Sequence, residues 1–195
     1  MRKFLLALSV VVALLGTGYT QCSQKCKSAF EVVVRHEDHN MSGVVTKEPF
    51  GGVARFGVNS RAHPEAVHAG YYRMPRLRAL RYAQSLFWRS YWLPIHGDEI
   101  RDDRLATKLA DLAYNLGPVR ATILLQRALN QLGSGLVARG YLGGDTLSAL
   151  SNLPSPALLV LVKYQAAGFY TRLAHRHPAQ MQAWKATWLN RLSDG

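Results

Sequence analysis

Apolar residues recur at helical spacing in this 195-residue chain on both sides of one stretch, and this exception limits the folds that the chain can adopt. Residues 40–60, NMSGVVTKEPFGGVARFGVNS, mix four glycines with valine and phenylalanine, a pattern typical of a small hairpin or irregular sheet. On both sides of this stretch, apolar residues recur at helical spacing. The sequence therefore predicts a mainly α (α+β) fold with a small β element near residues 41–60.

The helix that precedes the β element carries an unusual carboxylate at its end. Residues 28–31, SAFE, form a capping box, so we expect the helix to begin at Ser28. Phe30, Val33 and Val34 then share one helical face with Glu37. If Glu37 continues this buried stripe, partial desolvation should raise its pKa. The alternative is a helix that ends one residue earlier and leaves Glu37 as a solvated cap.

Further helices are expected after Pro75, each with its own start or stop signal. Gly117 ends one helix, and Pro118 begins the next. The expected helical segments are 77–92, 102–117, 118–132, a short helix opened by Asp145 or Thr146, a long helix from Ser155 to about His175, and a last helix from Pro178.

The charge and the N-terminus together indicate an exported protein. The net charge is +12, so the surface attracts polyanions such as nucleic acid, anionic lipid or anionic cell wall. Arg2 and Lys3 precede an apolar run over residues 4–15, which suits a signal-peptide core better than a stable membrane span. Because no convincing cleavage site follows, we expect residues 1–21 to act either as a signal peptide or as a weak inner-membrane anchor. We expect the rest of the chain to reach the periplasm. The polyanion that its basic surface attracts should therefore not be nucleic acid.

Cysteine and histidine usage limits the chemistry further. Cys22 and Cys26 are the two cysteines of the chain, so a local bridge, a dimer bridge or two free thiols are possible, and a cysteine nucleophile in the body is excluded. Zinc ligands could come from the HEDH stretch and from two later histidines, but HEDH lacks the spacing of the H-E-x-x-H motif. We therefore expect no metal and no other cofactor. The side chains that could bind zinc are those of His36, Asp38, His39, His63 and His68.

Several short motifs follow one another in an order that resembles a known enzyme family. The resemblance covers roughly residues 28–192 and is to the N-acetylmuramidase endolysins of glycoside hydrolase family 108, which have a C-terminal peptidoglycan-binding-like region. The matching positions are Glu37; EPFGGVARFGV at 48–58; WRSYW at 88–92; Asp111, Asn115 and Gly117; Leu125 and Gln126; RGYLGGDT at 139–146; and Thr187, Trp188 and Arg191.

This resemblance implies a lysozyme-like fold and a glycosidase that cleaves the β-1,4 bond between N-acetylmuramic acid and N-acetylglucosamine in peptidoglycan. Glu37 would be the general acid, and Glu48 is preferred over Asp38 as the second catalytic group. The substrate-binding residues would be Arg55, Asn59, Ser60, Asp111 and Asn115, although Asn59 and Ser60 also fit ordinary turn chemistry. The implied domains are 27–132 for the muramidase and 133–195 for the peptidoglycan-binding-like region. We expect a monomer whose partner is the glycan strand and whose role is host lysis by a phage or prophage.

The chain departs from the family pattern beside its expected catalytic residues. Asp38, His39 and Asn40 stand where the family has Gly-Gly-Tyr, and Glu48 stands where the family has aspartate. Ala54 replaces a threonine and cannot orient a water molecule. A lytic transglycosylase that uses the same Glu37 therefore stays open, as does a non-catalytic wall-binding protein.

Overall fold

The computed structural model describes residues 22–49 and 51–178, and these form a mainly helical, lysozyme-like fold with a small antiparallel sheet. The expected N-terminal segment, the expected helix after Pro178 and the motif at residues 187–191 lie outside the described residues. The α-helices are α1 (Gln24–Glu37), α2 (Pro64–His68), α3 (Arg76–Phe87), α4 (Asp103–Leu116), α5 (Pro118–Gln131), α6 (Gly144–Asn152) and α7 (Ser155–Arg176). The strands are β1 (Thr46–Lys47), β2 (Val53–Arg55) and β3 (Val58–Asn59).

Helix α1 begins four residues before the predicted capping box. Ser23 is the N-cap, and its hydroxyl accepts a hydrogen bond from the amide of Cys26. A disulfide joins Cys22 to Cys26 across this first turn, so the local bridge is the arrangement that forms. Lys25 pairs with Asp103 at 3.0 Å, which ties the start of α1 to the start of α4. The predicted start at Ser28 is wrong because the bridge and the Ser23 cap extend the helix toward the N-terminus.

The β element is a three-stranded antiparallel sheet in the order β1-β2-β3. Ala54 of β2 lies opposite Thr46 on one side and Asn59 on the other. Phe56 and Gly57 form the tight turn between β2 and β3, with φ of 48° and 75°, the left-handed conformation that two-residue hairpin turns require. The ring of Phe56 is buried and packs against the Cα of Gly43. This turn is therefore anchored in the core.

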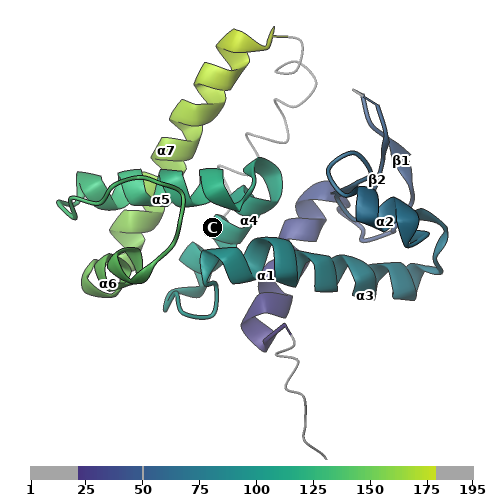
Figure 1. The fold of residues 1–195 in the computed structure, drawn as a ribbon, viewed down its shortest axis with the longest axis horizontal. Coiled ribbons are helices and arrows are strands. Elements are labelled where there is room, and N and C mark those ends of the chain that lie inside the picture. Colours follow the sequence, from purple (N-terminus) through teal and green to yellow (C-terminus); the bar gives the residue numbers. More distant parts are fainter. Residues whose placement is uncertain (1–21, 50, 179–195) are drawn as a thin grey trace, which may run out of the picture.

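Helix α4 is the centre of the molecule, because it packs against α1, α5 and α7. The β element and α2 lie at one end of the long axis, and α5, α6 and α7 lie at the other (Figure 1). A π-helical turn, Trp88–Trp92, continues α3 and places Trp92 in the core. The large side chains that are fully buried include Trp92, Tyr71, Phe56, Phe87, Leu105, Leu109, Leu112, Leu124 and Leu125.

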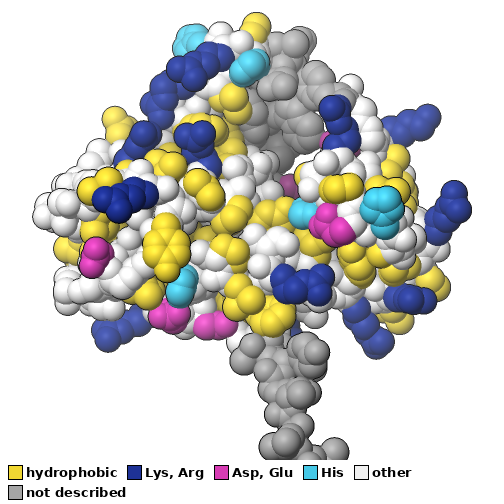
Figure 2. Space-filling model, viewed as in Figure 1, with side chains coloured by type: hydrophobic (Ala, Val, Ile, Leu, Met, Phe, Trp, Pro, Cys, Tyr) yellow, Lys and Arg dark blue, Asp and Glu magenta, His cyan; other side chains and the backbone are white. Residues whose placement is uncertain are grey.

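The surface matches the strongly basic composition of the chain. Lys and Arg side chains are spread over the face seen in Figure 2 and do not gather in a single patch. Among the residues described, no helix is both long enough and apolar enough to cross a membrane.

Candidate functional site

Glu37 is the last residue of α1 and stands at the rim of the core. Phe30, Val33 and Val34, which precede it on the same face, are buried, but the side chain of Glu37 is exposed. The prediction of a desolvated carboxyl is therefore wrong for the free protein. The physical reason is that α1 ends at Glu37, so the last position on the apolar face of the helix lies outside the core and in solvent.

The turn of the β2–β3 hairpin lies directly against Glu37. A Cβ placed on Gly57 would lie 2.6 Å from Glu37 Cγ and 2.7 Å from Tyr114 Cε1. Tyr114 donates a hydrogen bond of 2.9 Å to the carbonyl of Phe56 and so fixes the turn on α4. The end of α1, the hairpin turn and α4 therefore meet at Glu37. No local pattern in the sequence indicates this role of Tyr114, because its partner Phe56 lies 58 residues away.

Asp38 organises the chain just after Glu37. Its carboxylate accepts hydrogen bonds from the amide and hydroxyl of Ser42 and, at 2.6 Å, from the amide of Gly43. Partial burial by itself would raise the pKa of Asp38, but these bonds and the guanidinium of Arg76 outweigh it, so the pKa lies below its usual value. With its oxygens used in this way, Asp38 shapes the loop that leads from α1 to the sheet.

His36, the residue before Glu37, contacts a buried carboxylate. His36 Nδ1 lies 3.0 Å from Asp111 Oδ1, and Lys108 Nζ lies 3.8 Å from Asp111 Oδ2. Asp111 is 1% exposed and Lys108 is 4% exposed. Because its carboxylate is buried and contacts His36, Asp111 holds the end of α1 in place. A contact of Asp111 with substrate stays a prediction.

A second group of polar side chains, Tyr91, His63 and Glu65, lies on the other side of Tyr114. The rings of Tyr91 and Tyr114 meet edge to face at a centroid distance of 4.8 Å. The hydroxyl of Tyr91 is 2.5 Å from His63 Nε2, and His63 Nδ1 is 2.7 Å from Glu65 Oε1. Burial, together with the charges of Glu65 and Glu37, raises the pKa of Tyr91 to about 12. Tyr91 is therefore a neutral hydroxyl, and its ring packs on Tyr114, which itself lies beside Gly57 and Glu37.

The sequence contained one sign of this group. Tyr91 belongs to the WRSYW motif, but the motif alone gave it no function. His63 and Glu65 are brought to it by α2, a helix of five residues whose hydrophobic pattern is too short to recognise.

Glu48 follows β1 and lies at the opposite end of the sheet from the Phe56–Gly57 turn. Its amide donates to the carbonyl of Gly52, which places Glu48 opposite the start of β2. From Gly52 to Phe56 a strand advances about 13 Å, so this distance separates the backbone of Glu48 from the turn that touches Glu37. Glu48 is half-buried, and this burial raises its pKa above the ordinary value.

Arg55 has an internal role. It is 7% exposed, and its guanidinium donates to the carbonyls of Gly43, Tyr71 and Met74 at 2.7, 3.2 and 2.7 Å. The hydroxyl of Tyr71 donates in return to the carbonyl of Arg55. The geometry therefore argues against the predicted contact of Arg55 with substrate, because these donors hold the sheet to the segment after α2.

The remaining predicted contacts use side-chain oxygens within the protein. Asn59 Oδ1 accepts from the amide of Arg61, as expected for turn chemistry. Ser60 Oγ instead accepts from the amide of Val53, across the pair of strands β2 and β3. Asn115 Oδ1 accepts from the hydroxyl of Tyr170, which joins α4 to α7. For these three residues a contact with substrate stays a prediction.

The described part of the chain contains no cluster of three or more His, Cys, Asp or Glu side chains suited to a metal ion. Glu37 and the β element next to it offer groups for acid–base chemistry: an exposed carboxyl at the end of α1, a half-buried carboxyl at the far end of the sheet and a neutral tyrosine hydroxyl. Enzymes that cleave a glycosidic bond usually use two carboxyl groups.

Comparison with known proteins agrees with this chemistry. Residues 30–117 match the family model described as "Glycosyl hydrolase 108", and residues 120–193 match the model described as "Predicted Peptidoglycan domain". The first model includes Glu37, Glu48, Tyr91 and Tyr114, and the second begins within α5. The two models meet near residue 118, whereas the domain boundary expected from the sequence lies at 132.

A search of curated proteins found no match to the chain. Solved structures, however, support the fold. Among solved structures, SagA from Brucella abortus is similar, with a TM-score of 0.55 and 18% sequence identity over 87% of this chain and 98% of that one. The two family models cover consecutive stretches of the sequence in the order that the motifs had indicated. The chain therefore combines a glycosyl hydrolase 108 region over residues 30–117 with a predicted peptidoglycan domain over residues 120–193, the combination of a peptidoglycan hydrolase.

Proposed function

We propose that the protein is an N-acetylmuramidase that cleaves the β-1,4 bond between N-acetylmuramic acid and N-acetylglucosamine, with Glu37 as the general acid. The observation that carries this proposal is the contact of Glu37 with Gly57. It holds an exposed carboxyl in one place, at the junction of the helix end and the sheet, where a glycan strand can reach it. Glu37 would protonate the leaving oxygen as the glycosidic bond breaks.

Glu48 is the proposed second carboxylate. In this role Glu48 would accept the proton of the water molecule that attacks the anomeric carbon. Its half-buried position and raised pKa support a carboxyl that exchanges protons.

Tyr91 and His63 are proposed as positioning residues for Glu37. The ring of Tyr91 packs on Tyr114, which lies beside the contact of Gly57 with Glu37. The hydroxyl of Tyr91 is held by His63, which in turn pairs with Glu65. On the other side, His36 ties the same helix end to Asp111. Rigid support of this kind keeps a catalytic group in its productive orientation.

A lytic transglycosylase is the second candidate, and Ala54 favours it. Ala54 lies in the middle strand of the sheet and has no hydroxyl that could hold a water molecule. A transglycosylase needs no such water, because the muramic acid closes an anhydro ring on itself. It would use the same Glu37 as its acid.

Mass spectrometry of the muropeptides released from purified peptidoglycan tests the proposal. Hydrolysis adds one water molecule and gives reducing ends. Anhydro ends would contradict hydrolysis and support the transglycosylase. Release of no muropeptides at all by the folded protein would contradict both and leave a wall-binding protein.

We further propose that the protein acts outside the cytoplasm, in host lysis by a phage or prophage. The disulfide between Cys22 and Cys26 supports an oxidising compartment such as the periplasm. Tethering by residues 1–21 before release remains part of this proposal, and those residues lie outside the described ones. Fractionation of cells combined with intact-mass measurement tests it, since an intact chain should move from the membrane to the soluble fraction.

A further inference from the structure

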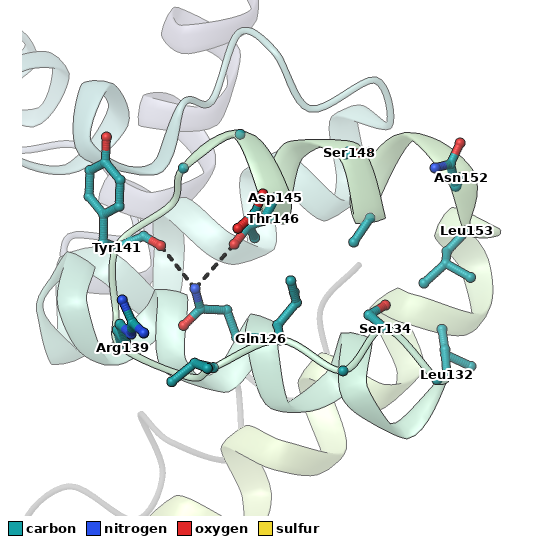
Figure 3. A pocket seen from close by; sticks show the side chains of 17 residues that line it. Gln126, Leu132, Ser134, Arg139, Tyr141, Asp145, Thr146, Ser148, Asn152 and Leu153 are labelled. Atoms are coloured by element: carbon teal, nitrogen blue, oxygen red, sulfur yellow. Dashed lines mark hydrogen bonds between the residues drawn. The ribbon is translucent and has the colours of Figure 1, made fainter.

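A large cavity with a mixed polar and apolar lining lies in the C-terminal half of the described chain. It has a volume of about 830 Å³ and lies between α6 and the irregular segment that joins α5 to α6, residues 132–143 (Figure 3). Pockets of this size hold a ligand of several residues or sugar rings. A connecting segment of this length without helix or strand is more often functional than incidental.

Two amide side chains of α5 hold the wall of the cavity in place. Gln126 donates to the carbonyl of Tyr141 and to the hydroxyl of Thr146, and it accepts from the amide of Gly140 at 3.0 Å. Asn130 exchanges two hydrogen bonds with the backbone of Leu136, of 2.6 and 2.7 Å. The segment is therefore pinned at both ends, and a preformed site of this kind loses little entropy when it binds a ligand.

The charges of the cavity differ from those of the whole protein. Although the chain has a net charge of +12, the residues that line the cavity include one cation, Arg139, and one anion, Asp145. Arg139 comes from the joining segment and Asp145 from the first turn of α6 (Figure 3). Tyr141, also in the lining, is 74% exposed and offers a flat ring at the rim. Asp145 would repel a polyanion, whereas a ligand with one positive and one negative group could pair with both Asp145 and Arg139. The lining therefore fits a ligand that carries both signs of charge.

We propose that this cavity binds the peptide stems of peptidoglycan, through their free carboxylate and amine groups, and not the bare glycan. Arg139 would pair with a carboxylate and Asp145 with an amine, because charge-assisted hydrogen bonds are the strongest that side chains offer. The ring of Tyr141 would cover the apolar part of the peptide. This inference rests on the proposed function for its choice of polymer, since it assumes that the protein works on the cell wall.

The test measures binding of a free tetrapeptide stem that contains diaminopimelate to the full chain, by calorimetry and by amide chemical-shift mapping. We expect Arg139→Gln and Asp145→Asn each to weaken binding about tenfold or more, since each removes one charge-assisted contact. Arg127→Gln is the matched control, because Arg127 is exposed on α5 and does not line the cavity. The amides that shift should lie within residues 134–149.

Four results would overturn the inference. The tetrapeptide could fail to bind, both variants could bind as well as Arg127→Gln, or the shifted amides could lie around Gly57. Equal binding of a peptide-free chitooligosaccharide in the cavity would also contradict it. The tetrapeptide has no glycosidic bond, so its binding does not depend on Glu37. Retained peptide binding by a protein that fails to cleave glycan would contradict the proposed function and still support this site.

Discussion

The backbone of Gly57 touches the side chain of Glu37 so closely that a Cβ at position 57 would lie 2.6 Å from Glu37 Cγ. The φ of Gly57 is also 75°, in the left-handed region. A glycine at the hairpin turn thus serves two purposes: it permits the turn, and it leaves space for the carboxyl-bearing side chain of the helix end.

Replacing Gly57 by alanine should therefore displace Glu37. We expect a loss of about 1–3 kcal/mol in the free energy of unfolding from the left-handed φ alone, together with a loss of muralytic activity. Gly70→Ala is the matched control, because Gly70 has a φ of 68° and no atom within 4 Å of its would-be Cβ. Thermal unfolding and turnover are measured for both. If Gly57→Ala loses stability but keeps the activity of Gly70→Ala, the contact does not position Glu37.

The pair formed by His36 and Asp111 should support both stability and activity. Replacing Asp111 by asparagine removes a buried charge-assisted contact, which should cost about 1–3 kcal/mol in the free energy of unfolding. Asp98→Asn is a suitable control, because Asp98 is exposed and accepts one hydrogen bond, from Ser23. Urea unfolding of His36→Gln, Asp111→Asn and the double variant should give a coupling free energy of at least about 1 kcal/mol. Strictly additive losses would show that the two side chains do not act together.

Tyr91→Phe should lower kcat beyond what its loss in the free energy of unfolding explains. The hydroxyl that it removes lies 2.5 Å from His63 Nε2, on a ring that packs on Tyr114 beside Gly57 and Glu37. Tyr72→Phe removes a comparable hydroxyl, which donates to the carbonyl of Val58. Both variants should lose about 1 kcal/mol in the free energy of unfolding, but only Tyr91→Phe should lower kcat. An equal fall of kcat in the two variants would mean that the effect reaches the site through the fold.

The pH dependence of activity should reflect Glu48. If Glu48 must be ionised to accept a proton from water, its pKa, raised by burial above 4.5, places the acidic limb of the activity profile above that pH. Glu48→Asp should keep part of the activity, because it retains a carboxylate, whereas Glu48→Gln should abolish the limb together with most of the turnover. An unchanged acidic limb in Glu48→Gln would assign it to another group.

The raised pKa of Glu48 also affects the stability of the fold. A folded-state pKa above the unfolded value means that the folded protein binds the proton more tightly. The contribution of Glu48 to stability is therefore present below about pH 4.5 and is lost as the pH rises through the folded-state pKa. Glu48→Gln should remove this part of the pH dependence in urea unfolding.

The long helices could be predicted from the sequence because their signals are local. The apolar stripe and the Gly117–Pro118 junction indicated α4 and α5 within a residue or two of their observed bounds. The start of α1 could not be predicted in this way, since it depends on a disulfide that formed between two cysteines for which other states were open. Helix α2 was missed because five residues carry too little periodicity.

The site was less predictable than the fold, because it depends on contacts between distant segments. Arg55 has the chemistry of a substrate contact, but the structure buries its guanidinium among backbone carbonyls. Glu37 shares a face with buried valines, but the end of the helix turns it toward solvent. Tyr114 reaches the hairpin across 58 residues of sequence, a pairing that no local pattern indicates.

The most direct test of the central claim is the turnover of Glu37→Gln on purified peptidoglycan, measured by mass spectrometry of the released muropeptides. Glu31→Gln is the control, because Glu31 is an exposed carboxylate on the same helix, paired with Arg35. We predict that Glu37→Gln stays folded and loses at least about 100-fold in turnover, as the removal of a general acid requires, while Glu31→Gln cleaves normally. Near-normal turnover by folded Glu37→Gln would contradict the assignment of Glu37 as the acid.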